Sequence, residues 1–176
     1  MTGKRSGKLA FCGVMTALAL VFLLLTATPV STVALAALAA VCGIPVVVEA
    51  GKRAALLHFV AVAVLASLLV PTVEGKGMYI ALFGWYTVFK AWLESKRLPR
   101  VAEWGSKLAV FVVALAAFAA VMWLTVRATF PYAYWTLTPI AVLLCGVFLV
   151  YDWGLSGLVG LYMSRLHRPI SRLFRF

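Results

Sequence analysis

Six long apolar runs constrain the fold of this chain more than any other feature. They cover residues 8–28, 31–49, 53–72, 77–94, 105–128 and 136–164. A helix of about 20 residues crosses a hydrocarbon core of about 30 Å, so each run is near the length of one membrane-spanning helix. The chain is 65% hydrophobic and 12% charged, and it contains neither Asn nor Gln. We therefore expect an all-α polytopic bundle of six transmembrane helices, forming a single domain over residues 1–176 in the cell membrane.

Lys and Arg are distributed unequally between the two ends of the expected helices. The chain has 16 of these residues, and 14 fall on one side when six spans are drawn, leaving only Lys76 and Arg127 on the other. Because cytoplasmic loops are enriched in Lys and Arg, this asymmetry predicts that both termini are cytoplasmic. The net charge of +11 then follows from the topology, and no nucleic-acid partner is expected.

The hydrophobic segment 139–167, which overlaps most of the last run, contains one carboxylate, Asp152. A carboxylate in apolar surroundings needs a partner, water or a proton, so Asp152 has either a structural or a functional role. In a helix it shares one side with several Gly and Ser residues, and such a side lets a neighbouring helix approach closely. Lys90 in the fourth run either extends to the membrane interface or faces inward and forms an intramembrane charge pair with Asp152.

Aromatic residues gather at two places that could bind a small molecule. Trp85 and Tyr86 lie in the fourth run, and Arg127, Tyr132 and Trp135 lie between the fifth and sixth runs. Aromatic rings beside one cation suit a flat or anionic ligand, so we predict substrate binding by these five residues. The alternative is an aromatic belt at the membrane interface.

Several smaller features complete the interpretation. Gly13 and Ala17 are four residues apart, a spacing that suits contact with a partner helix or ordinary internal packing. Pro45 should kink the second helix or lie near its end. Glu49 is expected to pair with Lys52 or Arg53, and the segment 168–176 to form an interfacial amphipathic tail on membrane lipid.

Motifs for catalysis and metal binding are missing from the sequence. It contains no GxSxG, HExxH or Walker A pattern, and its three cysteines all lie inside apolar runs without paired spacing. His58 is the one histidine inside a run, so hydrogen bonding within the bundle is the expected role for it. We therefore predict a protein that is not an enzyme and that has no cofactor and no metal site.

Two resemblances extend this interpretation. The start KLAFCGVMTALALVF and the end SGLVGLYMSRL of the expected bundle resemble the substrate-binding S component of energy-coupling factor transporters. That resemblance implies a six-helix fold with a pocket toward the outside, and as partners a transmembrane T subunit and two cytoplasmic ATPases. It also implies that Gly13 and Ala17 contact the T subunit. The chain also resembles a group of small uncharacterised membrane proteins of Gram-positive bacteria. The matching positions are Phe83-Gly84-Trp85-Tyr86 with Lys90, and the pair Tyr151-Asp152.

Two functional hypotheses follow. The first is a membrane-embedded small-molecule binding subunit of an energy-coupling-factor-like uptake transporter. The second is a structural or assembly membrane protein without a ligand, held together by Lys90 and Asp152. Vitamin-sized polar ligands need directional polar groups. A chain without Asn and Gln suits a hydrophobic or flat substrate better.

Overall fold

The computed structural model describes residues 2–28, 31–96, 99–125, 134–167 and 169–170, and of residues 2–5, 100, 121–125, 134–142 and 144 it describes the backbone alone. Throughout these ranges the regular structure is helical, without a strand, so the predicted all-α class is confirmed. The longer elements are α1 (Thr2–Leu25), α2 (Thr32–Val41), α3 (Gly43–Ala50), α4 (Lys52–Leu69), α7 (Arg100–Thr125) and α8 (Tyr134–Leu161). The shorter ones are α5 (Val73–Met78), α6 (Tyr86–Glu94) and the π-helical turns η1 (Tyr79–Phe83) and η2 (Tyr162–Leu166).

Five helical segments of the described chain are long and apolar enough to cross a membrane. They are Ser6–Leu25, Thr32–Ala50, Lys52–Leu69, Val101–Ala120 and Cys145–Leu166. These segments match the first, second, third, fifth and sixth apolar runs of the sequence. The fourth run does not form one long helix, and the two short helices and the π-turn that replace it place Tyr79, Phe83 and Tyr86 in the core.

The second run is broken at Cys42, between α2 and α3. Pro45 explains the break, because it has no N–H to donate to the carbonyl of Val41 and its ring collides with that carbonyl in a straight helix. α2 accordingly ends at Val41, and Pro45 lies in the first turn of α3, where helices tolerate proline. The helix is therefore interrupted one turn before Pro45, and the kink itself stays a prediction.

The fourth run folds as α5, η1 and α6 in succession. Its π-turn is closed by a hydrogen bond of 2.7 Å from the Gly84 N–H to the carbonyl of Tyr79, five residues earlier. A Cβ at position 84 would lie 2.8 Å from ring atoms of both Phe59 and Tyr79. Only glycine fits here, and this close approach brings α6 against α4.

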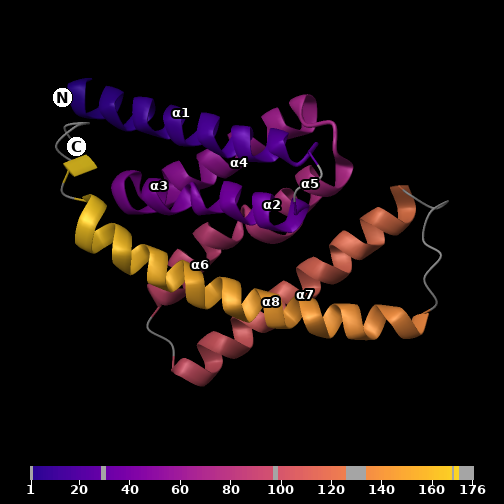
Figure 1. Cartoon of the computed structure of the whole chain (residues 1–176). Helices are drawn as coiled ribbons and strands as arrows, with labels where there is room; N and C mark the ends of the chain where they lie inside the picture. Colours follow the sequence, from indigo (N-terminus) through magenta and orange to yellow (C-terminus); the bar gives the residue numbers. More distant parts are fainter. Residues whose placement is uncertain (1, 29–30, 97–98, 126–133, 168, 171–176) are drawn as a thin grey trace.

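The helices pack into one body with α6 between its two parts (Figure 1). α1 to α4 lie together on one side, and α7 and α8 run past each other on the other side. The core between the N-terminal helices is built largely from small side chains that permit close helix contact, including Ala19, Ala36, Ala39 and Ala66. Larger residues fill the space toward α8, including Phe83, Phe111 and Phe148.

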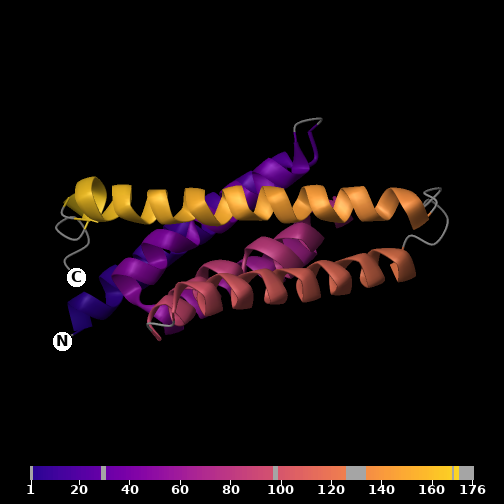
Figure 2. The same cartoon turned by 90° about the horizontal axis from the view of Figure 1, so that it is seen from below.

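The start of α1 and the end of η2 lie at the same end of the molecule (Figure 2). At this end the Lys52 ammonium donates to the Ser95 hydroxyl over 2.8 Å. The Glu49 carboxylate also accepts hydrogen bonds at this end, from Tyr162 over 3.0 Å and from the ring of His167 over 2.7 Å. The expected pairing of Glu49 with Lys52 or Arg53 is therefore wrong, because η2 brings better-placed donors to a carboxylate that is largely buried.

The glycines of α8 were expected to face a neighbouring helix, but α8 packs against the bundle through larger side chains. Its buried stripe contains Phe148, Asp152 and Leu155, continued by Tyr162 in η2. The four described glycines of α8 have no neighbour within 4 Å of a built Cβ, namely Gly146, Gly154, Gly157 and Gly160. Large side chains therefore fill the interior here, and the glycines face away from the rest of the chain. The expected amphipathic tail lies outside the described residues, apart from 169 and 170.

Candidate functional site

Three buried charged side chains meet where α6, α7 and α8 come together. Lys90 of α6, Lys107 of α7 and Asp152 of α8 are each at most 4% exposed. The Lys90 Nζ lies 2.5 Å from one carboxylate oxygen of Asp152, and the Lys107 Nζ lies 3.4 Å from the other. The pair that the sequence suggested is thus in direct contact, and it is joined by a second lysine.

Hydrogen bonds from two neutral side chains complete this site, which we call the ionic cluster: Tyr86, Lys90, Lys107, Asp152 and Ser156. The hydroxyl of Tyr86 donates to Asp152 over 2.6 Å. Lys90 also donates to the main-chain carbonyl of Asp152 over 2.8 Å and to Ser156 over 2.7 Å. An ammonium has three N–H groups, so these two acceptors and the carboxylate satisfy Lys90 completely.

Two glutamates form the outer rim of the ionic cluster. Glu103, one turn before Lys107 on α7, accepts from its ammonium over 2.6 Å. Glu94 lies 3.4 Å from Lys107 and 3.6 Å from Lys90, and its side chain is 45% exposed. The cluster with its rim therefore contains two positive and three negative charges, and Glu94, Glu103 and the exposed Ser156 connect it to the surface.

The cost of burying these charges explains why the arrangement is so complete. Removing an ion from water costs several kcal/mol, and breaking a buried pair by deleting one partner costs about 3–5 kcal/mol. On the inner side the site is sealed by aromatic rings. Tyr86 packs edge-on against Phe148 with ring centroids 5.0 Å apart, and Phe148 stacks on Phe111 at 4.0 Å. These rings exclude water from one flank of the charges and so strengthen their interaction.

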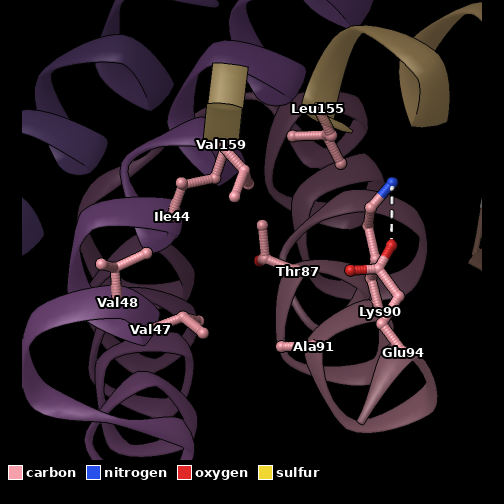
Figure 3. A pocket seen from close by; sticks show the side chains of 9 residues that line it. All are labelled: Ile44, Val47, Val48, Thr87, Lys90, Ala91, Glu94, Leu155 and Val159. Atoms are coloured by element: carbon pink, nitrogen blue, oxygen red, sulfur yellow. Dashed lines mark ion pairs between the residues drawn. The ribbon is translucent and has the colours of Figure 1, made fainter. Parts of the chain in front are cut away.

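A cavity of about 80 Å³ lies beside Lys90, between α3, α6 and α8 (Figure 3). Its wall on α3 is formed by Ile44, Val47 and Val48, which face Thr87 and Ala91 of α6 across the gap. The Thr87 hydroxyl donates to the carbonyl of Gly84, so it is already bonded within the helix. The space suffices for a few water molecules, but it is well below the about 300 Å³ of the smallest usual ligand pockets.

The five residues predicted to bind substrate have different surroundings. Tyr86 is 1% exposed and belongs to the ionic cluster. The indole N–H of Trp85 donates to the carbonyl of Ala81 over 2.7 Å, and its ring lines a surface groove with Lys52 and Arg53. Arg127 and Tyr132 lie outside the described residues, as does the side chain of Trp135. The common pocket of these five stays a prediction.

The residues predicted to contact a partner helix lie on the surface of α1. Gly13 and Ala17 are both exposed, and a Cβ built on Gly13 meets nothing within 4 Å. Gly13 forms part of a groove of about 540 Å³ between α1 and the start of α4. His58 lies at the bottom of this groove, and its ring bonds to the Thr16 hydroxyl over 2.9 Å, as expected for a structural histidine.

Sequence reasoning missed the parts of the site that depend on a third helix. Lys107 was counted among the cytoplasmic basic residues, and Glu103 and Ser156 received no role. One signal was present, because Glu103 and Lys107 have the spacing of a helical ion pair and Lys107 lies two turns inside an apolar helix. Nothing in the local sequence indicates that Lys107 reaches Asp152.

The acidic, histidine and cysteine side chains of the described ranges form no group of three that could hold a metal ion. The one buried carboxylate of the ionic cluster is already paired with the ammonium groups of Lys90 and Lys107. Comparison with protein-family models, with curated proteins and with solved structures finds no match to this chain.

Proposed function

We propose that this protein is a multi-pass protein of the cell membrane with six passes and both termini in the cytoplasm. Five apolar helices support five passes, and the succession α5, η1 and α6 would form the fourth in chain order. The orientation is supported by the described basic residues near one end of the molecule: Lys8 early in α1, Lys52 and Arg53 at the start of α4, Lys96 just after α6, and Arg165 in η2.

This topology is tested by labelling single cysteines with a membrane-impermeant maleimide in cells. In a background with Cys12, Cys42 and Cys145 replaced by Ala, Thr28→Cys should react in intact cells. Ser95→Cys should react only after permeabilisation. Both positions are exposed, so burial does not prevent labelling. Equal reaction of the two cysteines in intact cells would contradict the proposal.

We further propose that the protein acts as a non-enzymatic structural or assembly subunit whose second half is held by the ionic cluster. The observation that carries this proposal is the complete internal satisfaction of Lys90, which leaves no N–H for a ligand. Charged groups that bind a substrate need free donors or acceptors. A cluster that uses its own polar groups on three helices instead fixes how those helices pack.

A binding subunit of an energy-coupling-factor-like transporter is the second candidate, and the exposure of Gly13 and Ala17 favours it. In this version the α1 surface would contact a transmembrane T subunit coupled to cytoplasmic ATPases. Small residues at an exposed helix surface allow another helix to come close. The substrate would then be bound by the part of the chain that includes Arg127, Tyr132 and Trp135.

The test of this second candidate is purification from membranes in a mild detergent, followed by mass spectrometry. A T subunit and ATPases should accompany the wild-type protein and be lost from Gly13→Leu plus Ala17→Leu. Gly157→Leu is the matched control, because that glycine is also exposed and has open space around it. Equal recovery of these partners with all three proteins would exclude the α1 contact. If the partners are absent from the wild-type preparation, this second candidate is rejected and the assembly proposal is the one that stands.

A further inference from the structure

A second groove, separate from the ionic cluster, runs between the start of α4 and α6. It has a volume of about 370 Å³ and is lined by both basic and apolar side chains. Lys52 and Arg53 are at its outer end, where α4 begins. Leu56 follows one turn further in on α4, and Val88 and Phe89 face it from α6. The groove thus has a cationic end and an apolar length, the shape of a site for an amphiphile with an anionic head.

Aromatic rings make the length of this groove suitable for a hydrocarbon chain. Trp85 and Phe89 pack edge to face with centroids 5.6 Å apart, and Phe89 is followed by Trp92 at 6.2 Å. The Trp85 N–H is already bonded to Ala81, so the indole offers the groove only an apolar surface. From Trp85 to Trp92 the wall extends about 10 Å along the helix at about 1.5 Å per residue.

The cationic end has no negative charge of its own to balance it. All five acidic side chains of the sequence fall within the described residues, and none forms an ion pair with Lys52 or Arg53. Lys52 has one neutral partner there, the hydroxyl of Ser95. Lys96 adds a third positive charge nearby, with its ammonium 3.7 Å above the ring of Trp92.

The first turn of α4 adds to the attraction for an anion. Gly51 precedes the helix and provides no side-chain cap. The first main-chain N–H with a helical partner is that of Ala55, so the N–H groups before it have no partner within the helix. Free N–H groups at a helix start favour phosphate oxygens, and here they coincide with Lys52 and Arg53.

We propose that this groove binds an anionic phospholipid of the cytoplasmic leaflet, with its phosphate at Lys52 and Arg53 and an acyl chain along Trp85 and Phe89. The proposal rests on the membrane topology proposed above, which puts this end of α4 in the cytoplasm. Basic pockets between helices on the cytoplasmic side suit such headgroups, and each cation near them contributes about a fivefold gain in affinity.

The experiment measures binding of phosphatidylglycerol and phosphatidylcholine to the purified full chain by native mass spectrometry. Phosphatidylglycerol should be retained preferentially, and Lys52→Gln plus Arg53→Gln should weaken its binding by about 30-fold. The control, Lys8→Gln plus Arg165→Gln, removes the same charge from the same end of the molecule and should retain the preference. Equal weakening in both double variants would reduce the effect to net charge and overturn the proposal.

Two further measurements distinguish a bound phospholipid from a free phosphate in the groove. Phosphatidylglycerol with brominated acyl chains should quench tryptophan fluorescence, and Trp85→Phe should remove part of that quenching. Glycerol 3-phosphate should not compete at equal concentration, and if it competes fully the site recognises a free phosphate and not a lipid. Resistance to alkaline extraction tests membrane insertion separately, so a chain that stays in the membrane without preferring phosphatidylglycerol overturns only the lipid proposal.

Discussion

Replacing Asp152 with Ala tests the ionic cluster most directly. The substitution removes the carboxylate that faces Lys90, Lys107 and Tyr86 but keeps the main-chain carbonyl that accepts from Lys90. Lys107 also keeps Glu103 at 2.6 Å. The loss therefore falls mainly on Lys90, which becomes a buried ammonium with two neutral acceptors and the half-exposed Glu94 at 3.6 Å, and on the Tyr86 hydroxyl, which loses its acceptor.

The expected magnitude follows from these two losses. A buried charge deprived of its partner costs about 3 kcal/mol, at the low end of the usual range because Lys90 keeps two acceptors. An unsatisfied buried hydroxyl adds about 1 kcal/mol. Asp152→Ala should thus lower the free energy of unfolding by about 4 kcal/mol, which for a chain of this size corresponds to a fall in Tm of about 8–16 °C.

A double-mutant cycle separates the interaction between Lys90 and Asp152 from the independent effect of each substitution on stability. Lys90→Met alone should cost about 2 kcal/mol, because Asp152 keeps Tyr86 and Lys107. The variant with both substitutions should be no less stable than Asp152→Ala, since no unpaired ammonium remains at position 90. This corresponds to a coupling of about 2 kcal/mol.

The assay is reversible unfolding by SDS in mixed micelles, followed by tryptophan fluorescence, with thermal unfolding in dodecyl maltoside beside it. Glu74→Ala is the control, because Glu74 is an exposed acid in α5, outside the ionic cluster and its rim. Its effect should stay within about 0.5 kcal/mol and should add to that of Lys90→Met. Simple additivity of Lys90→Met and Asp152→Ala, with a coupling below about 0.5 kcal/mol, would refute the reasoning.

Exchanging the charges, with Lys90→Asp and Asp152→Lys together, should not restore stability. The new lysine would face Lys107, which now lies 3.4 Å from Asp152, so full recovery of Tm would show that Lys107 does not belong to the cluster. Gly84→Ala should lower the free energy of unfolding by about 1–3 kcal/mol, because the methyl group would collide with Phe59 and Tyr79. Gly146→Ala, on an open face, should be neutral or slightly stabilising. Similar unfolding curves for the two variants would contradict the close contact at Gly84. Tyr162→Phe should cost about 1 kcal/mol by removing the hydrogen bond to Glu49, and an unchanged Tm in dodecyl maltoside would mean that water replaces it.

The helices themselves could largely be predicted from the sequence. Hydrophobic length is a local property, so five of the six apolar runs appear as long helices at nearly the expected places. The fourth run was harder, because it contains a π-turn, and the turn ends at Gly84, where a Cβ would lie 2.8 Å from Phe59, a residue in another helix. An interruption before Pro45 was predictable, since the missing N–H acts within one turn.

Part of the candidate site could likewise be predicted from the sequence, and part could not. The sequence offered the pairing of Lys90 with Asp152 as one of two alternatives, because two opposite charges in apolar helices are costly unless they meet. The depth of Asp152 could not be predicted, because the last apolar run is longer than one span and the sequence does not say where along it the membrane ends. The contact between Lys90 and Asp152 needed the structure.

Only the tertiary structure decided which other groups join them. Lys107 reaches Asp152 because α7 crosses α8 at that point, and Glu49 reaches His167, 118 residues later, because the end of α8 crosses α3. The outward direction of the α8 glycines and the groove at Lys52 and Arg53 likewise result from how the helices are rotated and tilted. Rotation and tilt depend on side-chain packing between helices, which no single stretch of sequence contains.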